Sequence, residues 1–323
     1  MRYTIFLTLL VMTGVNQAAA QDFRAQDFRI ATWNLEWLME PKVLRSLRTS
    51  CVPSGALPRG LVRVIPCDVA QSKERSAADF AALARYAARI DAQVVALQEV
   101  DGRAPARRLF PDHNFCFSAR AHVQNLGFAI RKSVPYRCDG DLVALSLGDT
   151  VRRGVQLTIF PGTANEMHLL AVHLKSGCGR RALDGDKTEC ATLARQAPVL
   201  EQWIDAQAAE GRLFAVLGDF NRDLKWDGGD AGSRPSPASS LWLELNDGDP
   251  PGAELTLAAD QGLFQNCSVA QNFRGFIDQI VLGKALAARA VKGSMVRVTY
   301  ENADVAARRL SDHCPVSLAL RLE

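Results

Sequence analysis

The chain has 323 residues, of which 48% are hydrophobic and 23% are charged. It has 38 Lys and Arg against 35 Asp and Glu, so the formal net charge is only +3. These values are typical of a globular protein and exclude a wholly disordered chain, a collagen-like chain and a polybasic nucleic-acid-binding arm.

Residues 1–20 have the composition of a secretory signal peptide. Arg2 precedes an apolar run over residues 5–15, and three alanines that end at Ala20 supply a small-residue cleavage site before Gln21. The apolar run is too short to span a bilayer, which needs about 20 residues. We therefore expect cleavage near Ala20–Gln21 and a secreted or periplasmic protein; a short membrane anchor is the alternative.

Short apolar stretches recur along the chain and predict strands. These strands are expected over residues 28–33, 94–97, 126–130, 142–147, 155–160, 167–172, 213–217, 276–282, 296–300 and 316–320. Helices are expected over residues 74–90 and 189–210, and Pro198 should kink or split the second helix. Residues 49–67 should form a loop stapled by cysteines, and residues 226–237 an exposed loop.

The alternation of buried strands with a few helices predicts one layered α/β domain. It would cover residues 28–323, after a short N-terminal segment of residues 21–27. We find no linker between these strands and helices that would mark a domain boundary.

The cysteine count is even, which predicts disulfides in an exported protein. The eight cysteines are Cys51, Cys67, Cys116, Cys138, Cys178, Cys190, Cys267 and Cys314. Eight cysteines allow about a hundred pairings, so the connectivity does not follow from the sequence. Short loop closure favours Cys51–Cys67 and Cys178–Cys190, and the lack of a C-x-x-C pair argues against structural zinc.

Polar residues lie at the ends of several predicted strands. The clusters are Thr32-Trp33-Asn34, Gln98-Glu99, His173, Gly218-Asp219-Phe220-Asn221, Asp278-Gln279 and Ser311-Asp312-His313. Polar groups placed where buried strands emerge can converge on one cleft of an α/β sheet. One such group alone is more often a cap or turn residue, but six in one chain predict an active site.

The ordered set WNL, QEV, VHLKSG, GDFN, IDQI and SDHCPV resembles the endonuclease/exonuclease/phosphatase superfamily. That family includes deoxyribonuclease I, exonuclease III-type AP endonucleases, inositol polyphosphate 5-phosphatases and neutral sphingomyelinases. The resemblance spans about residues 29–320 and suggests a secreted bacterial-type member. It implies a deoxyribonuclease I-like four-layer α/β sandwich, in which helices flank two packed mixed β-sheets.

The resemblance also implies a metal site. Asn34 and Glu99 match the family residues that hold a divalent ion, and Asp312 matches a residue near the same ion. Their oxygen atoms are ligands that Mg²⁺ prefers, with Mn²⁺ and Ca²⁺ as alternatives. Glu36 lies near Asn34 in the chain, either near the metal or simply at the surface, and we favour the surface.

A catalytic role is implied for five further residues. His313 would be the general base, and Asp278 would orient its imidazole. Asp219 and Asn221 would act at the phosphate, although an Asx turn at a strand end is the alternative for this pair. His173 would donate to the phosphate or protonate the leaving oxygen.

Basic residues follow His173 closely in the sequence. Lys175, Arg180 and Arg181 would contact phosphate, with solvated surface charges as the alternative. In deoxyribonuclease I a Glu partners the equivalent of His173, but the similar stretch here, residues 117–120, reads FSAR and contains no Glu.

The sequence therefore predicts a metal-dependent phosphodiesterase, most specifically an endonuclease that hydrolyses DNA or RNA. A phospholipid phosphodiesterase of the sphingomyelinase type is an alternative, with residues 241–243 as its membrane-facing segment, as is an inositol phosphate phosphatase. A non-catalytic binding protein on the same fold is the remaining alternative. We expect a monomer with no protein partner.

Overall fold

The described part of the chain begins at Asp27. The computed structural model describes residues 27–323 apart from residues 54–62, 231–236, 262–265, 269–270 and 272–274. The expected signal peptide lies outside the described residues, so its cleavage stays a prediction.

Twelve strands of the described chain form two six-stranded sheets. The first sheet, in the order β11-β12-β1-β2-β4-β3, contains β1 (Phe28–Leu38), β2 (Val94–Val100), β3 (His113–Phe117), β4 (Asn125–Arg131), β11 (Val296–Arg297) and β12 (Val316–Leu320). The second sheet, in the order β5-β6-β7-β8-β10-β9, contains β5 (Tyr136–Leu142), β6 (Gly154–Ile159), β7 (Met167–His173), β8 (Leu213–Asp219), β9 (Leu255–Leu257) and β10 (Asp278–Gly283). Both sheets are mixed, because β1 pairs with β2 and β7 with β8 in parallel, whereas the other strand pairs are antiparallel.

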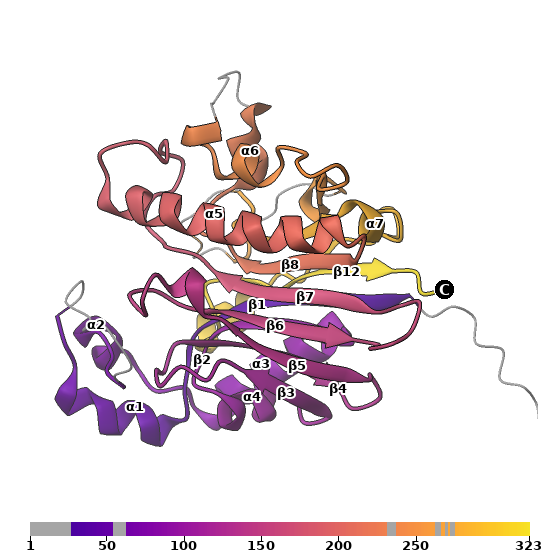
Figure 1. The fold of residues 1–323 in the computed structure, drawn as a ribbon. Helices are drawn as coiled ribbons and strands as arrows, with labels where there is room; N and C mark the ends of the chain where they lie inside the picture. Colours follow the sequence, from indigo (N-terminus) through magenta and orange to yellow (C-terminus); the bar gives the residue numbers. More distant parts are fainter. Residues whose placement is uncertain (1–26, 54–62, 231–236, 262–265, 269–270, 272–274) are drawn as a thin grey trace, which may run out of the picture.

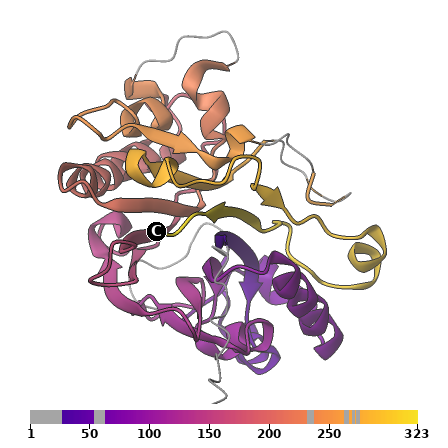
Figure 2. The ribbon, with the colours of Figure 1, turned by 90° about the vertical axis from the view of Figure 1, so that its right-hand side faces the viewer.

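The described chain contains eight α-helices. They are α1 (Pro41–Leu47), α2 (Cys67–Gln71), α3 (Ala77–Ile90), α4 (Arg103–Leu109), α5 (Thr188–Ala209), α6 (Leu241–Leu245), α7 (Lys284–Ala287) and α8 (Asn302–Ala307). Helices α3 and α4 bury their apolar faces against the first sheet, and α5 and α6 against the second (Figure 1). Figure 2 shows the same layers from the side. The expected four-layer α/β sandwich is confirmed.

The main core lies between the two sheets. Ile30, Val94 and Phe128 of the first sheet pack in one cluster with Leu169 and Leu217 of the second, and all five are fully buried. Burying each such side chain stabilises the fold by about 1.5–3 kcal/mol. This core fixes how the ends of the strands from the two sheets meet.

Two predicted elements differ from the structure. Residues 142–147 were expected to form a strand, but Val143–Ser146 is a 3₁₀ turn in which Ser146 Oγ donates to the Val143 carbonyl (2.7 Å). The neighbouring strand β5 was not predicted, because it is an edge strand whose mainly exposed side chains form no apolar run. Helix α5 is also continuous through Pro198, because its apolar face is buried along its length, so the expected split is wrong.

The expected exposed loop at residues 226–237 is only partly described. Residues Trp226–Asp230 form a short π-helix, and residues 231–236 lie outside the described part. Asp227 is 2% exposed and forms an ion pair with the buried Arg222. The start of this stretch is therefore a packed segment rather than an exposed loop.

All eight cysteines form disulfides. The two predicted pairs, Cys51–Cys67 and Cys178–Cys190, are confirmed, and the remaining pairs are Cys116–Cys138 and Cys267–Cys314. Four disulfides are typical of a protein from an oxidising compartment. In the described residues we find no helix with the length and apolarity needed to cross a membrane.

Carboxylates gather where α5 meets the α6 region, and they predict a pH-dependent stability. Burial, together with the nearby carboxylates of Glu244, Asp205 and Asp247, raises the pKa of Glu201 from 4.5 to about 7. The folded chain thus favours protonated Glu201, and this group costs the fold stability progressively as pH rises from about 4.5 to about 7. We expect Glu201→Gln to raise the Tm at pH 8 and to leave it unchanged at pH 4, measured by calorimetry.

Glu189→Gln is the matched control, because Glu189 lies in the first turn of the same helix. It should bring no gain in Tm at either pH. Equal Tm values for Glu201→Gln and the unmodified chain at pH 8 would show that the carboxylate cluster does not penalise the fold.

Candidate active site

The register of the second sheet places three predicted site residues in one row. Asp278 of β10 is opposite Asp219 of β8, and Asp219 is opposite His173 of β7. All three are buried, with 1–3% exposure. The row lies where β7 and β8 end and β10 begins, so polar side chains meet at a single edge of the sheet.

Gly218 allows this close approach of β8 to β7. A Cβ atom at this position would lie 1.9 Å from the Val172 carbonyl oxygen, far closer than any side chain tolerates. The glycine in the GDFN motif is therefore needed for the strand pairing that sets Asp219 beside His173.

The first sheet supplies Asn34 and Glu99 from the ends of its parallel strands. Asn34 of β1 is opposite Gln98 of β2, and Glu99 is the next residue. Asn34 Nδ2 lies 3.0 Å from Asp219 Oδ2 and 3.4 Å from Glu99 Oε1. The Asn34 amide thus joins the carboxylates of the two sheets.

Unusual backbone conformations gather at this junction. Glu36, Trp37, Glu99 and Asn221 have positive φ angles of 46°, 53°, 60° and 53°. In two of them the strained backbone serves the site: the Trp37 N–H donates to Glu99 Oε2 (3.1 Å) and the Glu36 N–H to Asn34 Oδ1 (3.0 Å). Strain of about 1–3 kcal/mol per residue persists where the surroundings enforce it, and it is common at active sites.

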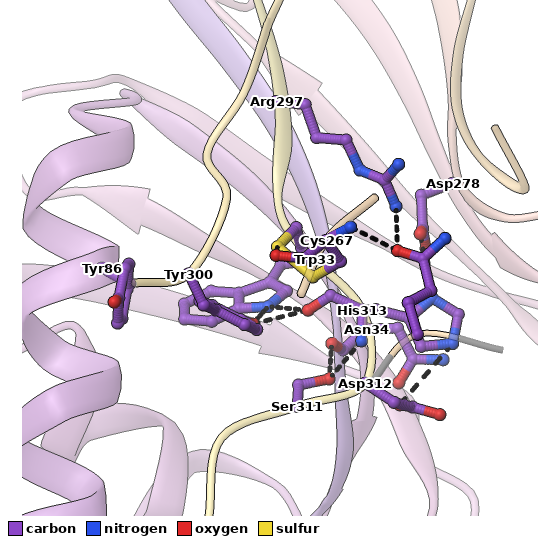
Figure 3. Close-up of a disulfide and its surroundings, with 12 residues drawn as sticks. Trp33, Asn34, Tyr86, Cys267, Asp278, Arg297, Tyr300, Ser311, Asp312 and His313 are labelled. Carbon is purple, nitrogen blue, oxygen red and sulfur yellow. Dashed lines mark hydrogen bonds and ion pairs between the residues drawn. A yellow bond between two sulfur atoms is a disulfide. The ribbon is translucent and has the colours of Figure 1, made fainter. Parts of the chain in front are cut away.

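His313 and Asp278 form a buried pair (Figure 3). The His313 Nδ1 atom lies 3.0 and 2.9 Å from the two Asp278 carboxylate oxygens. Burial by itself lowers the pKa of His313, but the Asp278 and Asp219 carboxylates outweigh it and raise the pKa well above 6.5. The pair therefore favours a proton on the imidazole and stabilises the imidazolium that a general base becomes.

Asp219 lies at the centre of the site. Its Oδ1 accepts from the Asn221 N–H (2.7 Å), as in an Asx turn, while Oδ2 faces Asn34 and lies 3.4 Å from His173 Nε2. Asp219 thus makes the turn contact and faces the other site residues at once. Burial raises the pKa of the Asp219 carboxyl above 3.8; His313 lowers it and Asp278 raises it further.

His173 has a different environment from His313. Its Nε2 lies 3.4 Å from Asp219 Oδ2 and 3.7 Å from Glu99 Oε1. Burial, with Arg152 and then His313, lowers the pKa of His173 well below 6.5, so the neutral ring prevails at neutral pH. Within the described part of the chain its Nδ1 has no hydrogen-bond partner, which accords with the lack of a Glu in the FSAR stretch.

Arg152 is a site neighbour that the sequence did not reveal. Its guanidinium donates to the carbonyls of His173 (2.9 Å) and Leu174 (2.6 Å), and its positive charge acts on Glu99 and Asp219. It fixes the end of β7 beside the cluster of predicted site residues. The sequence around Arg152, an Arg-Arg pair before a strand, does not predict this role, because the carbonyls that Arg152 contacts belong to another strand of the sheet.

An open pocket of about 310 Å³ adjoins the cluster, and we call it the carboxylate pocket. Its lining includes Glu36, Glu99, Asp312 and His313. The Glu36 side chain is 35% exposed and lines this pocket with the other two carboxylates. Burial raises the pKa of Glu36; Arg75 opposes the rise, and Asp312 and Glu99 add to it.

The carboxylate pocket suits a hard divalent cation. Three carboxylates line this pocket and offer oxygen ligands, and the repulsion of Asp312 and Glu99 on Glu36 favours a cation near them. Asn34 Oδ1 already accepts from the Glu36 N–H, but an amide oxygen keeps a second lone pair. Asp219, Asp278 and His313 form a second compact group, although Asp278 and His313 are already bonded to each other.

The predicted substrate-contact residues lie outside this cluster. Lys175 Nζ donates to the Ser176 carbonyl, and Arg180 pairs with Asp223 (3.3 Å). Arg181 is exposed. The Cys178–Cys190 disulfide pins this segment. Contact with substrate phosphates stays a prediction for all three basic residues.

Known proteins share this sequence pattern and fold. The model of the Endonuclease/Exonuclease/phosphatase family matches residues 31–313, and no curated protein matches the chain. Danio rerio TDP2 complexed with single strand DNA product is 18% identical and covers 92% of this chain and 100% of its own, with a TM-score of 0.55. The Neisseria meningitidis 3'-5' exonuclease NExo is 18% identical (91% and 100% covered, TM-score 0.54), and the human Nocturnin catalytic domain is 12% identical (91% and 93%, TM-score 0.51). At these identities the likeness shows a common fold.

Proposed function

Because the chain belongs to the endonuclease/exonuclease/phosphatase family, we propose that it is a divalent-metal-dependent phosphodiesterase, and specifically an endonuclease of DNA or RNA. One observation carries the proposal: Asn34, Glu99 and the buried row of Asp278, Asp219 and His173 meet in one cluster beside His313. A fold alone would not support an activity, but this set of side chains does.

In this proposal His313 is the general base. Its Nδ1 is held by Asp278, which leaves Nε2 to take the proton of the attacking water. The 3.9 Å between Nε2 and Asp219 Oδ2 exceeds a direct hydrogen bond, so Asp219 does not take up the Nε2 lone pair. Asp278 stabilises the imidazolium that forms as the water attacks the phosphorus in line.

His173 and Asn221 would bind the non-bridging phosphate oxygens. A neutral His173 ring can donate one hydrogen bond without adding a charge, and the lowered pKa of His173 favours that form. Asp219 holds Asn221 in place by accepting from its N–H, and Asp219 Oδ2 lies 3.4 Å from His173 Nε2. Either His173 or Asn221 would also assist the leaving oxygen.

The metal would be Mg²⁺, with Mn²⁺ or Ca²⁺ as alternatives, held by Glu99, Asn34 and Asp312. We add Glu36 to this set because it lines the same pocket. A bound divalent cation would polarise the phosphoryl oxygens and favour the neutral form of His313 through its positive charge.

Nucleic acid is the substrate that the comparisons favour, because one similar structure is described with a single strand DNA product and another as a 3'-5' exonuclease. The case for a phospholipid substrate is weaker, because Leu241, in the segment expected to face the membrane, is fully buried against α5. An inositol phosphate substrate remains the second candidate. The four disulfides support secretion or export to the periplasm.

A substrate panel tests the proposal. Purified protein with Mg²⁺, Mn²⁺ or Ca²⁺ is incubated with plasmid DNA, RNA, sphingomyelin and an inositol phosphate. We expect cleavage of nucleic acid, with binding that weakens steeply as salt rises because phosphate contacts release counterions. Hydrolysis of sphingomyelin or the inositol phosphate alone would overturn the nuclease assignment.

A further inference from the structure

The base His313 lies in a loop whose backbone is outside any sheet ladder. The next strand, β12, begins only at Val316. The His313 N–H donates to Ser311 Oγ (3.1 Å), and its carbonyl accepts from Trp33 Nε1 (3.2 Å) and Tyr300 Oη (2.5 Å) (Figure 3). The position of the base therefore depends on contacts with side chains rather than on strand pairing.

The Cys267–Cys314 disulfide closes these contacts into a ring. Cys314 follows His313 directly, and both half-cystines are fully buried. The Cys267 carbonyl accepts from the Tyr300 N–H (3.1 Å), and Tyr300 in turn donates to the His313 carbonyl. Cys267 is thus linked to His313 in two ways: covalently through Cys314, and by hydrogen bonds through Tyr300.

The ring matters because the two members of the base pair come from different sheets. Asp278 begins β10 of the second sheet, whereas His313 precedes β12 of the first. Cys267 lies on the stretch of chain that leads to Asp278. Cys267 and Cys314 both lie in the apolar cluster of the first sheet, together with Trp33 and Tyr300. The disulfide consequently braces the residue after His313 within that cluster, while Asp278 is held by the second sheet.

We propose that the Cys267–Cys314 disulfide, together with Tyr300, is a positioning element that holds His313 against Asp278. This inference rests on the proposed function, in which His313 is the general base. Catalytic groups must be held within about 0.5 Å of their productive position. A misplacement of about 1 Å can lower a rate by about 10²-fold.

The first test compares two disulfide deletions. Cys267→Ala/Cys314→Ala removes the ring, and Cys116→Ala/Cys138→Ala is the control because it joins the edge strands β3 and β5. Both are assayed well below their melting temperatures on the substrate that the panel identifies. We expect kcat to fall at least about 10-fold, with KM changed less than about 3-fold, in the first variant alone.

Tyr300→Phe is a second variant that keeps the disulfide and removes only the hydroxyl, which donates to the His313 carbonyl and accepts from Trp33 Nε1. It should lower kcat in the same direction, by about 3-fold or more, since it loosens the His313 carbonyl. This variant decides the question if the cysteine deletion fails to fold.

An NMR measurement separates this inference from the proposed function. The His313 Nδ1–H proton, bonded to Asp278, should give a far-downfield resonance in the unmodified chain and in the Cys116/Cys138 control, without substrate. Loss of this resonance in Cys267→Ala/Cys314→Ala supports positioning even if no substrate is hydrolysed. An unchanged resonance, or equal falls in kcat for both deletions, would overturn the proposal.

Discussion

His313→Ala is expected to lower kcat for nucleic acid hydrolysis by at least about 10²-fold, the scale of general acid–base catalysis. In the proposed mechanism the imidazole takes the proton of the attacking water, whereas Asp278 lies behind it on the Nδ1 side. Steady-state kinetics with saturating Mg²⁺ measures the effect, and circular dichroism checks that the fold persists.

Two further variants make this result specific. His313→Gln keeps an amide that can donate to Asp278, so it removes the base without leaving the buried carboxylate unpaired, and it should be nearly as inactive. His168→Ala, which removes a partly buried histidine that contacts Thr158 and Glu166, should keep most of the activity. Near-normal hydrolysis by His313→Gln would refute the role of the base.

Glu99→Gln is expected to lower kcat/KM by about 10²–10³-fold, the range found when one electrostatic stabiliser of a transition state is removed. The substitution keeps the shape of the side chain and an oxygen for the Trp37 N–H, but it removes a negative charge from the carboxylate pocket. Mn²⁺ binding, followed by isothermal titration calorimetry, should weaken in parallel.

Glu301→Gln is the control for the loss of one carboxylate. Glu301 is 70% exposed and pairs with Arg89 on the surface. Its removal should change neither Mn²⁺ affinity nor turnover. Unaltered Mn²⁺ binding by Glu99→Gln would place the cation elsewhere.

The sequence predicted the strands that carry the site, because these strands are buried on both faces. Val94–Leu97 and Leu213–Leu217 are uninterrupted apolar runs between two layers, and each ends in polar residues. Strand β5 gave no such signal, since an edge strand with exposed side chains has no need of apolar residues. Pro198 led us to expect a break in α5 that does not occur, because burial of the α5 face outweighs the lost backbone hydrogen bond.

The sequence predicted those site residues that lie in a recognisable motif of their own. His313, Asp278 and Asp219 lie in such motifs, and the sheet register then brings them together. Arg152 was not recognised, because its significance comes from neighbours contributed by distant strands. For Glu36 the motif left two readings open, and its place in the pocket follows from the strained backbone after Asn34. The Cys267–Cys314 pairing was also beyond a loop-length argument, since its members are 47 residues apart.

A crystal soaked with Mn²⁺ and measured at the manganese absorption edge tests the central claim most directly. That claim is that side chains far apart in the sequence surround a single divalent cation beside the His313–Asp278 pair. We predict one strong anomalous peak within coordination distance of Glu99 in the carboxylate pocket, and no such peak there in Glu99→Gln. A peak on another face of the molecule, or none in the pocket at saturating Mn²⁺, would contradict the account.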